Sequence, residues 1–270
     1  MDISTIGGLL LGWGGLLIAI LWEGDWSPHV IATFFNPSAF VLIAMGTLGA
    51  TVIGFPWAVT KGAFTILKKA FMEEVFDPRE TITMMVGFAT KARREGLLGL
   101  EEDIAGLNDP FLKKGLQLVV DGTEMEMVRN ILENDLNSLE TRHKMGENYF
   151  GAMGGFAPTL GIIGTVAGLV HALYSITDPS KISGAIAVAF LATFYGISSA
   201  NLIFLPLSGK LKVRSHEEVM VRTLMIEGVL SISAGDNPRI VEEKLKAYLD
   251  PKTKSAMEAA AAAGEAAAAK

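Results

Sequence analysis

The chain has 270 residues, half of them hydrophobic, with a formal net charge of −6 and no cysteine. The absence of cysteine excludes disulfide bonds, thiol catalysis and cysteine-bound metals. Basic and acidic residues are mixed within the same segments. This pattern argues against nucleic-acid binding, which usually needs a surface patch of clustered positive charges.

Four runs contain no Lys, Arg, Asp or Glu, and they cover residues 3–22, 39–60, 149–174 and 182–207. Each run reaches the length of about 20 apolar residues that spans a bilayer. The first run is not expected to be a cleaved signal peptide, since it has no basic flank and no small-residue cleavage site follows it. The sequence therefore predicts an all-α polytopic membrane protein with four transmembrane helices.

The basic residues predict the orientation of these helices. Residues 23–38 contain no Lys or Arg and residues 175–181 contain only Lys181, so all other basic residues lie in 61–148 and 208–270. The positive-inside rule places the basic segments and both termini in the cytoplasm. The predicted parts are two transmembrane helices with a short outer loop (1–60), a cytoplasmic helical domain (61–148), two transmembrane helices (149–207), cytoplasmic C-terminal helices (208–255) and an Ala-rich low-complexity tail (256–270).

The cytoplasmic segments follow helical patterns. The Asp-Pro pairs at 77–78 and 109–110 each predict a helix start, because proline suits the first helical turn. A long helix is expected from near Thr123 into the third span. The fourth span is expected to continue to Ser233, and Pro238 then begins one more short helix. The third and fourth transmembrane helices thus extend into the cytoplasm.

Small residues follow one face of the third span and one face of the fourth. These residues are Gly154, Pro158, Gly161, Thr165, Gly168 and Ala172 in the third span, and Ala185, Ala189, Thr193, Gly196 and Ala200 in the fourth. Small faces allow close helix packing, whereas the threonine hydroxyls favour a face next to water or an ion. The sequence leaves both interpretations open.

The four spans contain no ionisable side chain except His171, near the outer end of the third span. Ion pumps and transporters usually hold a carboxylate at membrane depth. If the protein serves ion movement, the carboxylate must therefore come from another chain. The small-residue face would then receive the helix of that chain.

Residues 91–103 place a basic cluster and an acidic cluster on either side of Gly96. One interpretation is a solvated helix end. The other is a docking surface of both signs, on which opposite charges of a partner would fix the register and speed encounter.

Four motifs resemble the MotA/PomA subunit of the bacterial flagellar stator. They are KARREGLLGLEEDI at 91–104, GGFAPTLGIIGTVAGLVHAL at 154–173, AVAFLATFYGISSANLIFLPLSGKL at 187–211 and EGVLSISAGDNPRIVEEKLKAYL at 227–249. The resemblance implies a homo-pentameric ring in the bacterial inner membrane, around a dimer of a MotB/PomB-type partner that supplies the ion-carrying aspartate. Ion flow would turn the ring, and the ring would drive the rotor protein FliG.

The resemblance also assigns roles to single residues and to the transported ion. The matching positions are the rotor-contact charges Arg93, Arg94 and Glu101, the coupling prolines Pro158 and Pro206, and the ion-path hydroxyls Thr165 and Thr193. No cofactor is implied. The transported cation is H+ or Na+, and two threonines resemble the sodium-driven pattern, which favours Na+.

Three other functions are less consistent with the sequence than a stator subunit. An ExbB/TolQ-type energiser of outer-membrane processes would have three spans, whereas four are predicted here. A self-sufficient channel is disfavoured by the uncharged spans, and a passive scaffold by their hydroxyl-bearing faces. An enzyme is not expected, because the sequence has no P-loop, metal-ligand cluster or catalytic triad.

Overall fold

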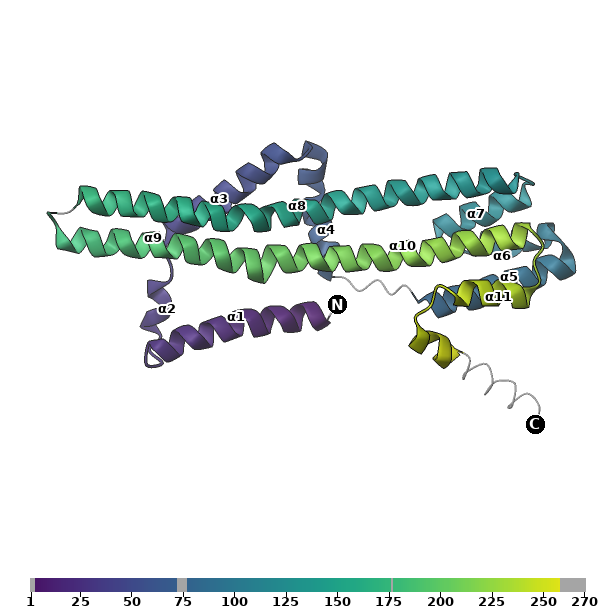
Figure 1. Cartoon of the computed structure of the whole chain (residues 1–270), viewed down its shortest axis with the longest axis horizontal. Helices are drawn as coiled ribbons and strands as arrows, with labels where there is room; N and C mark the ends of the chain where they lie inside the picture. The colour runs from purple at the N-terminus through teal and green to yellow at the C-terminus, as the bar shows by residue number, and fades with distance from the viewer. Residues whose placement is uncertain (1–2, 72–76, 176, 258–270) are drawn as a thin grey trace. The chain divides into compact units, whose positions relative to one another are not determined.

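The computed structural model describes residues 3–71, 77–175 and 177–257, and all regular elements in these ranges are helices (Figure 1). The chain forms two compact units. One unit comprises Met1–Glu74 and Arg142–Val213, and the other comprises Val75–Thr141 and Arg214–Lys270. Of the predicted Ala-rich tail, residues 258–270 lie outside the described residues.

The first unit contains the stretches that can cross a membrane. Four described helical stretches have the necessary length and apolar composition: 3–23, 37–54, part of 125–174 and part of 181–233. The elements of this unit are α1 (Ile3–Glu23), α2 (His29–Thr33), α3 (Pro37–Gly54), α4 (Trp57–Phe71), α9 (Pro179–Ser199) and the π-helix η2 (Ala200–Phe204), together with parts of α8 (Met125–Tyr174) and α10 (Leu205–Ser233). The predicted all-α membrane fold is confirmed.

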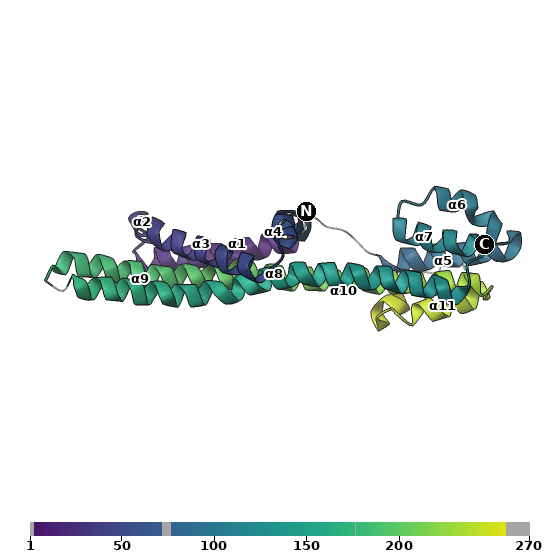
Figure 2. The same cartoon turned by 90° about the horizontal axis from the view of Figure 1, so that it is seen from above.

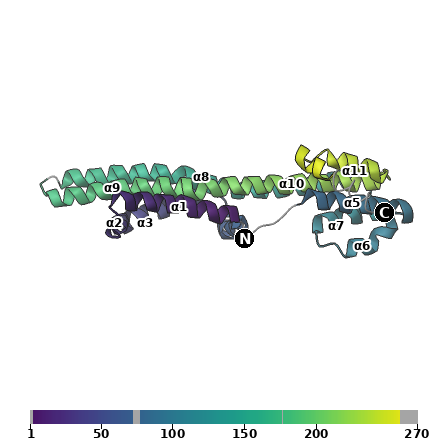
Figure 3. The same cartoon turned by 90° about the horizontal axis from the view of Figure 1, so that it is seen from below.

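The helices α8 and α9 lie side by side, with α1 and α3 along the pair (Figures 2 and 3). The side of α3 that packs on α9 carries Ala39, Ile43, Thr47 and Thr51, which are buried and four residues apart. This spacing keeps them on one helical face. The start of α3 is capped by Asn36, whose side chain accepts a hydrogen bond from the Ala39 amide at 3.0 Å.

The predicted run 39–60 is not one continuous helix. The helix α3 ends at Gly54, Phe55 is extended (φ −128°, ψ 149°), and α4 begins at Trp57. The cause is Pro56, because the proline ring disfavours helical backbone at the preceding residue. The uncharged run therefore includes the end of one helix and the start of another.

The fourth span also contains a turn that the sequence did not predict. A π-helix at Ala200–Phe204 joins α9 to α10 and ends two residues before Pro206. Proline has no amide hydrogen to donate to the preceding turn. A widened turn just ahead of proline accommodates that missing hydrogen bond, and such turns are often found at functional positions.

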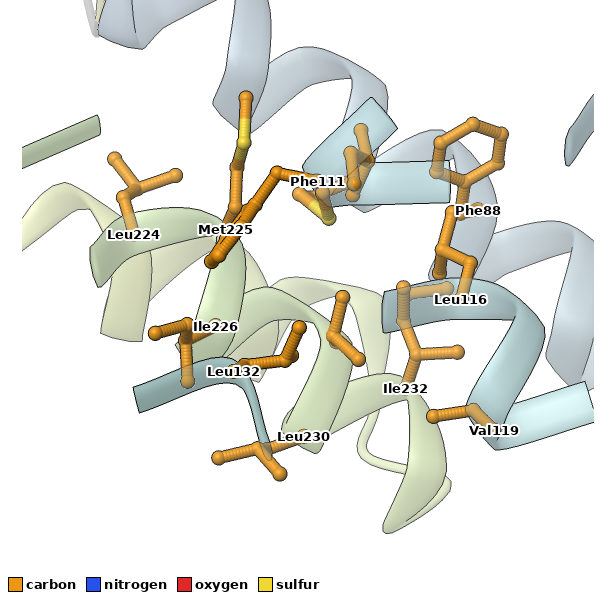
Figure 4. Packing of buried hydrophobic residues seen from close by; sticks show 14 of the residues in the cluster. Phe88, Phe111, Leu116, Val119, Leu132, Leu224, Met225, Ile226, Leu230 and Ile232 are labelled. Carbon is orange, nitrogen blue, oxygen red and sulfur yellow. The ribbon is translucent and has the colours of Figure 1, made fainter. Parts of the chain in front are cut away.

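The second unit is a helical domain with one apolar core. Its helices are α5 (Pro78–Glu95), the 3-10 helix η1 (Leu97–Leu100), α6 (Glu101–Ala105), α7 (Pro110–Val120) and α11 (Pro238–Lys246), together with parts of α8 and α10. Figure 4 shows how side chains from several of these helices meet. The fully buried core residues include Ile82, Met85, Leu112, Leu116, Leu132, Leu224 and Leu245.

The predicted helix starts in this unit are confirmed. The side chain of Asp77 accepts a hydrogen bond from the Arg79 amide, and the side chain of Asp109 accepts from the amides of Phe111 and Leu112. Asn237 caps α11 in the same way. Each cap precedes a proline in the first turn. Aspartate or asparagine satisfies a free amide there, and proline has none to satisfy.

Candidate functional site

The small residues of α8 face α9 of the same chain. A Cβ added at Gly161 would lie 3.0 Å from the Thr193 Cα, and one added at Gly168 would lie 2.7 Å from the Ala189 Cβ. At Gly196 an added Cβ would collide with the carbonyl oxygen of Ala157. The expectation that this face receives the helix of another chain is therefore wrong for these glycines. Small residues on both helices let their backbones meet, so the face is already covered.

Thr165 and Thr193 lie together at this contact, and both are half-buried. Their hydroxyl groups are hydrogen-bonded to each other. Thr165 Oγ1 also lies 3.1 Å from the carbonyl oxygens of Gly161 and Ala189, and Thr193 Oγ1 lies 3.2 Å from the Gly161 oxygen. The hydroxyls thus bridge two helices, and Thr165 bonds within its own helix as well.

Four oxygen atoms therefore converge where two uncharged helical segments meet. Backbone carbonyls and hydroxyls are the ligand type that hard cations accept, and carbonyls often replace water around ions inside membranes. The cluster carries no charge of its own. It could contact a passing cation but could not neutralise it.

The two predicted coupling prolines lie in different elements of this unit. Pro158 is inside α8 and half-buried, whereas Pro206 is exposed at the start of α10. Pro206 also lines a cavity of about 410 Å³ together with residues of α1, η2 and α10. Each proline lacks an amide hydrogen and so removes one backbone hydrogen bond. A helix can bend at such a position.

Tyr195 is a structural residue whose role the sequence did not predict. Its hydroxyl donates to the carbonyl oxygen of Phe34 and accepts from the Asn36 amide at 2.9 Å. These bonds hold the connection between α2 and α3 against α9. A tyrosine in an uncharged span was a signal for such a contact, because a buried hydroxyl usually finds a hydrogen-bond partner.

The predicted charged surface lies in the helical domain. Arg93 and Arg94 occupy the last turn of α5, Gly96 turns the chain with a φ of 81°, and Glu101 begins α6. Arg93, Arg94 and Glu101 are all exposed. Arg94 is paired with Glu95.

An ion pair joins the basic cluster to the acidic one. Lys91 Nζ donates to Asp103 Oδ2 at 2.8 Å, and this hydrogen bond raises the pKa of Lys91. Across the part of the chain that the structure describes, Arg93 and Glu101 form no ion pair. Lys91 and Asp103 therefore hold the turn, while Arg93 and Glu101 remain available to a partner.

A cleft of about 220 Å³ lies beside Arg93. The end of α5 and the loop between α10 and α11 line this cleft, which includes Asp236. Lys244 Nζ donates to Asp236 Oδ2 at 2.7 Å, and this hydrogen bond holds the pKa of Asp236 below its usual 3.8. The GDNPR segment at 235–239 belongs to one of the four motifs, but the sequence gives no sign that it lines a cleft with Arg93.

No group of three or more His, Asp or Glu side chains within residues 3–71, 77–175 and 177–257 is placed to hold a metal ion. In the first unit, the oxygen cluster at Thr165 and Thr193 supplies uncharged oxygen atoms that a cation could contact. These features define a class: an integral membrane protein with uncharged spans that meet at an oxygen-bearing contact, and with a charged helical domain.

Comparison with known proteins identifies the family. The model of the MotA/TolQ/ExbB proton channel family matches residues 103–223. Motility protein A of Borreliella burgdorferi is 38% identical over 91% of this chain and 95% of its own length. The chemotaxis protein PomA of Vibrio alginolyticus is 36% identical over 93% of this chain and 96% of its own.

Solved structures agree with this result. The flagellar MotAB stator complex from Bacillus subtilis contains a chain with a TM-score of 0.86 and 37% identity, covering 94% of this chain and 98% of that one. The chain in the C. jejuni MotAB structure has a TM-score of 0.86 and 30% identity, covering 93% and 97%. The chain therefore belongs to the MotA/PomA family of flagellar stator subunits, and the predicted resemblance is confirmed. It is an integral inner-membrane protein, and its family is one of motility ion channels rather than a known class of enzymes.

Proposed function

We propose that this chain forms a homo-pentameric ring around a dimer of a MotB/PomB-type partner, couples inward flow of H+ or Na+ to rotation of the ring, and passes torque to the rotor protein FliG. Both termini and the helical domain lie in the cytoplasm. The support is the membership in the stator family together with the distribution of basic residues. The divisions 1–60, 61–148, 149–207, 208–255 and 256–270 belong to this proposed topology.

The oxygen cluster at the α8–α9 contact is the observation that carries the proposed ion path. Thr165, Thr193 and the two carbonyls near them supply oxygen ligands and no charge. Two hydroxyls can replace part of the water around a dehydrating cation, which favours Na+ over H+. The path runs past Thr165 and Thr193.

The charge that binds the ion comes from the partner. Residues 149–174 and 182–207 contain no Asp or Glu, and a charged, unpaired carboxylate in the bilayer centre costs at least about 2.5 kcal/mol. Loading the partner's aspartate with a cation neutralises it and allows it to pass an apolar face. A five-fold ring cannot match both helices of a two-fold partner at once, so each ion exchange moves the mismatch and the ring steps.

Pro158 and Pro206 couple this step to movement of the helices. Both interrupt the backbone hydrogen bonding of a long helix, and Pro206 follows a π-turn. A helix with a missing bond bends at lower cost than an ideal one. The partner's movement is thereby transmitted along α8 and α10.

Arg93, Arg94 and Glu101 engage charges of opposite sign on FliG. All three are exposed, and Arg93 borders a cleft that includes Asp236. Charges of both signs on one surface fix the register of a partner and raise its association rate. An ExbB/TolQ-type energiser is the alternative, but two spans before the large charged segment and the motility-protein relatives favour the stator.

Ion flux into vesicles tests this function. The chain is reconstituted alone and with a MotB-type partner that lacks its plug, under separate Na+ and H+ gradients. Flux is expected only with the partner, and the effective gradient identifies the ion. Flux from this chain alone would contradict the proposal and indicate a self-contained channel.

A further inference from the structure

The helix α4 presents two different faces. It begins after Pro56, two residues beyond the end of the membrane-spanning helix α3 at Gly54. Its inner face packs against a cluster of buried residues of the first unit, Tyr149, Phe150, Met153 and Leu207. The residues that make these contacts are Val59, Ala63, Ile66, Leu67 and Phe71. The opposite, outer face of α4 does not contact this cluster.

The outer face alternates aromatic rings and lysines. Trp57, Lys61, Phe64 and Lys68 follow one another at intervals of four, three and four residues, which places them on a single stripe. All four are exposed, Trp57 by 62% and Phe64 by 80%. Lys61 Nζ lies 5.7 Å from the centre of the Trp57 ring. The sequence of α4 contains no Asp or Glu.

We propose that this stripe binds anionic phospholipid headgroups at the surface of the membrane. Exposed Trp and Phe are unfavourable in water but suit the boundary between headgroups and acyl chains. Lysines beside them attract the phosphates of an anionic leaflet. The length of α4, its opposite apolar face and its start three residues after the end of a membrane span all fit a helix that lies in the plane of the interface. Its place on the cytoplasmic leaflet rests on the proposed topology.

Fluorescence quenching by brominated lipids tests this binding. Trp13, Trp22 and Trp26 are replaced by phenylalanine, so that Trp57 is the remaining tryptophan of the full chain. The protein is reconstituted in phosphatidylcholine vesicles with a minor fraction of phosphatidylglycerol, with bromine on the acyl chains of one lipid or the other. We expect phosphatidylglycerol to be enriched around Trp57 by up to about 5-fold for each lysine.

The double variant Lys61→Gln/Lys68→Gln should lose this enrichment, and higher salt should weaken it in the unsubstituted stripe. Lys113→Gln/Lys252→Gln is the matched control, because it removes two exposed lysines elsewhere and should leave the enrichment unchanged. Quenching by each brominated lipid in proportion to its mole fraction in the vesicle would overturn the proposal. Absence of quenching by either would also overturn it, and would indicate that a second copy of the chain covers the stripe.

A separate measurement tests the topology. The chain has no cysteine, so a Thr65→Cys variant provides one exposed thiol on α4 for a membrane-impermeant maleimide. Labelling from the cytoplasmic side is expected. Labelling from the opposite side would contradict the proposed orientation while leaving the lipid preference of the stripe intact, so the two failures are distinguishable.

Discussion

At the scale of single residues, the hydroxyls of Thr165 and Thr193 join two helical segments that contain no charged side chain between residues 149–174 and 182–207. The hydroxyls of both residues reach backbone oxygens across the contact. The role of each threonine can therefore be tested with a separate variant.

Thr165→Val and Thr193→Val should each reduce ion flux through the assembled complex by roughly tenfold or more, since a contact with a charged group is worth about 1.5–3 kcal/mol. Assembly with the partner should persist. Thr159→Val is the control, because Thr159 is exposed and bonds to the carbonyl of Phe156 in its own helix. Equal flux in the three variants would remove the pair from the ion path.

Asp236 gives the helical domain a pH-dependent contact. The hydrogen bond from Lys244 lowers the pKa of Asp236 from its usual 3.8. The ionised carboxylate therefore stabilises the folded state above about pH 4, and this stabilisation is lost as the pH falls through the lowered pKa. The pair is partly exposed, so its contribution is below about 1 kcal/mol.

Asp236→Asn should lower the thermal unfolding midpoint slightly at pH 7, and the difference from wild type should shrink as the pH falls from about 4 through the lowered pKa of Asp236. Melting curves of the purified protein across this range provide the measurement. A difference between wild type and variant that grows on acidification would contradict the assigned role.

At the scale of elements, the pairing of α8 with α9 depends on glycines at which no side chain fits. Gly168 is one, because an added Cβ would lie 2.7 Å from the Ala189 Cβ and 3.0 Å from the Ala185 oxygen. Backbone atoms cannot move aside as a flexible side chain can. The two helices would have to separate.

Gly168→Val should therefore destabilise the membrane unit by about 1–3 kcal/mol, the usual range for overpacking. Thermal unfolding in detergent measures this effect. Gly155→Val is the matched control on the same helix, because nothing lies within 4 Å of an added Cβ there. Similar midpoints for the two variants would mean that the α8–α9 contact is looser than described.

At the scale of the whole molecule, we expect substitutions in the charged surface to impair motility without changing ion flux. Arg93→Glu reverses an exposed charge of the helical domain. It should leave ion flux through the complex unchanged and abolish or strongly reduce swimming. A charge reversal at the opposing position of FliG should restore part of the motility.

The matched control for this surface is Arg239→Glu, an exposed arginine in the first turn of α11. Motility that survives Arg93→Glu as well as it survives the control would exclude Arg93 from the rotor contact. Loss of ion flux in Arg93→Glu would instead indicate damage to the fold.

Features that depend on local chemistry were predictable from the sequence. Uncharged length predicted the spans, because charged groups are excluded from lipid. Aspartate before proline predicted the starts of α5 and α7, because the cap and the first turn use neighbouring residues. The break at Pro56 was also encoded locally, but the lack of charge between residues 39 and 60 concealed it.

The sequence by itself determined which segments are helical, which can enter the membrane and, through the resemblance of four motifs, the family. Only the tertiary structure decided that the small face of α8 is covered by α9, that Thr193 bonds to Gly161, and that Asp236 lies beside Arg93. Helix formation and membrane partition depend on residues close in sequence. Which element packs on a helical face depends on which surfaces fit in three dimensions. The sequence periodicity shows which residues share that face, but it does not show which helix packs against it.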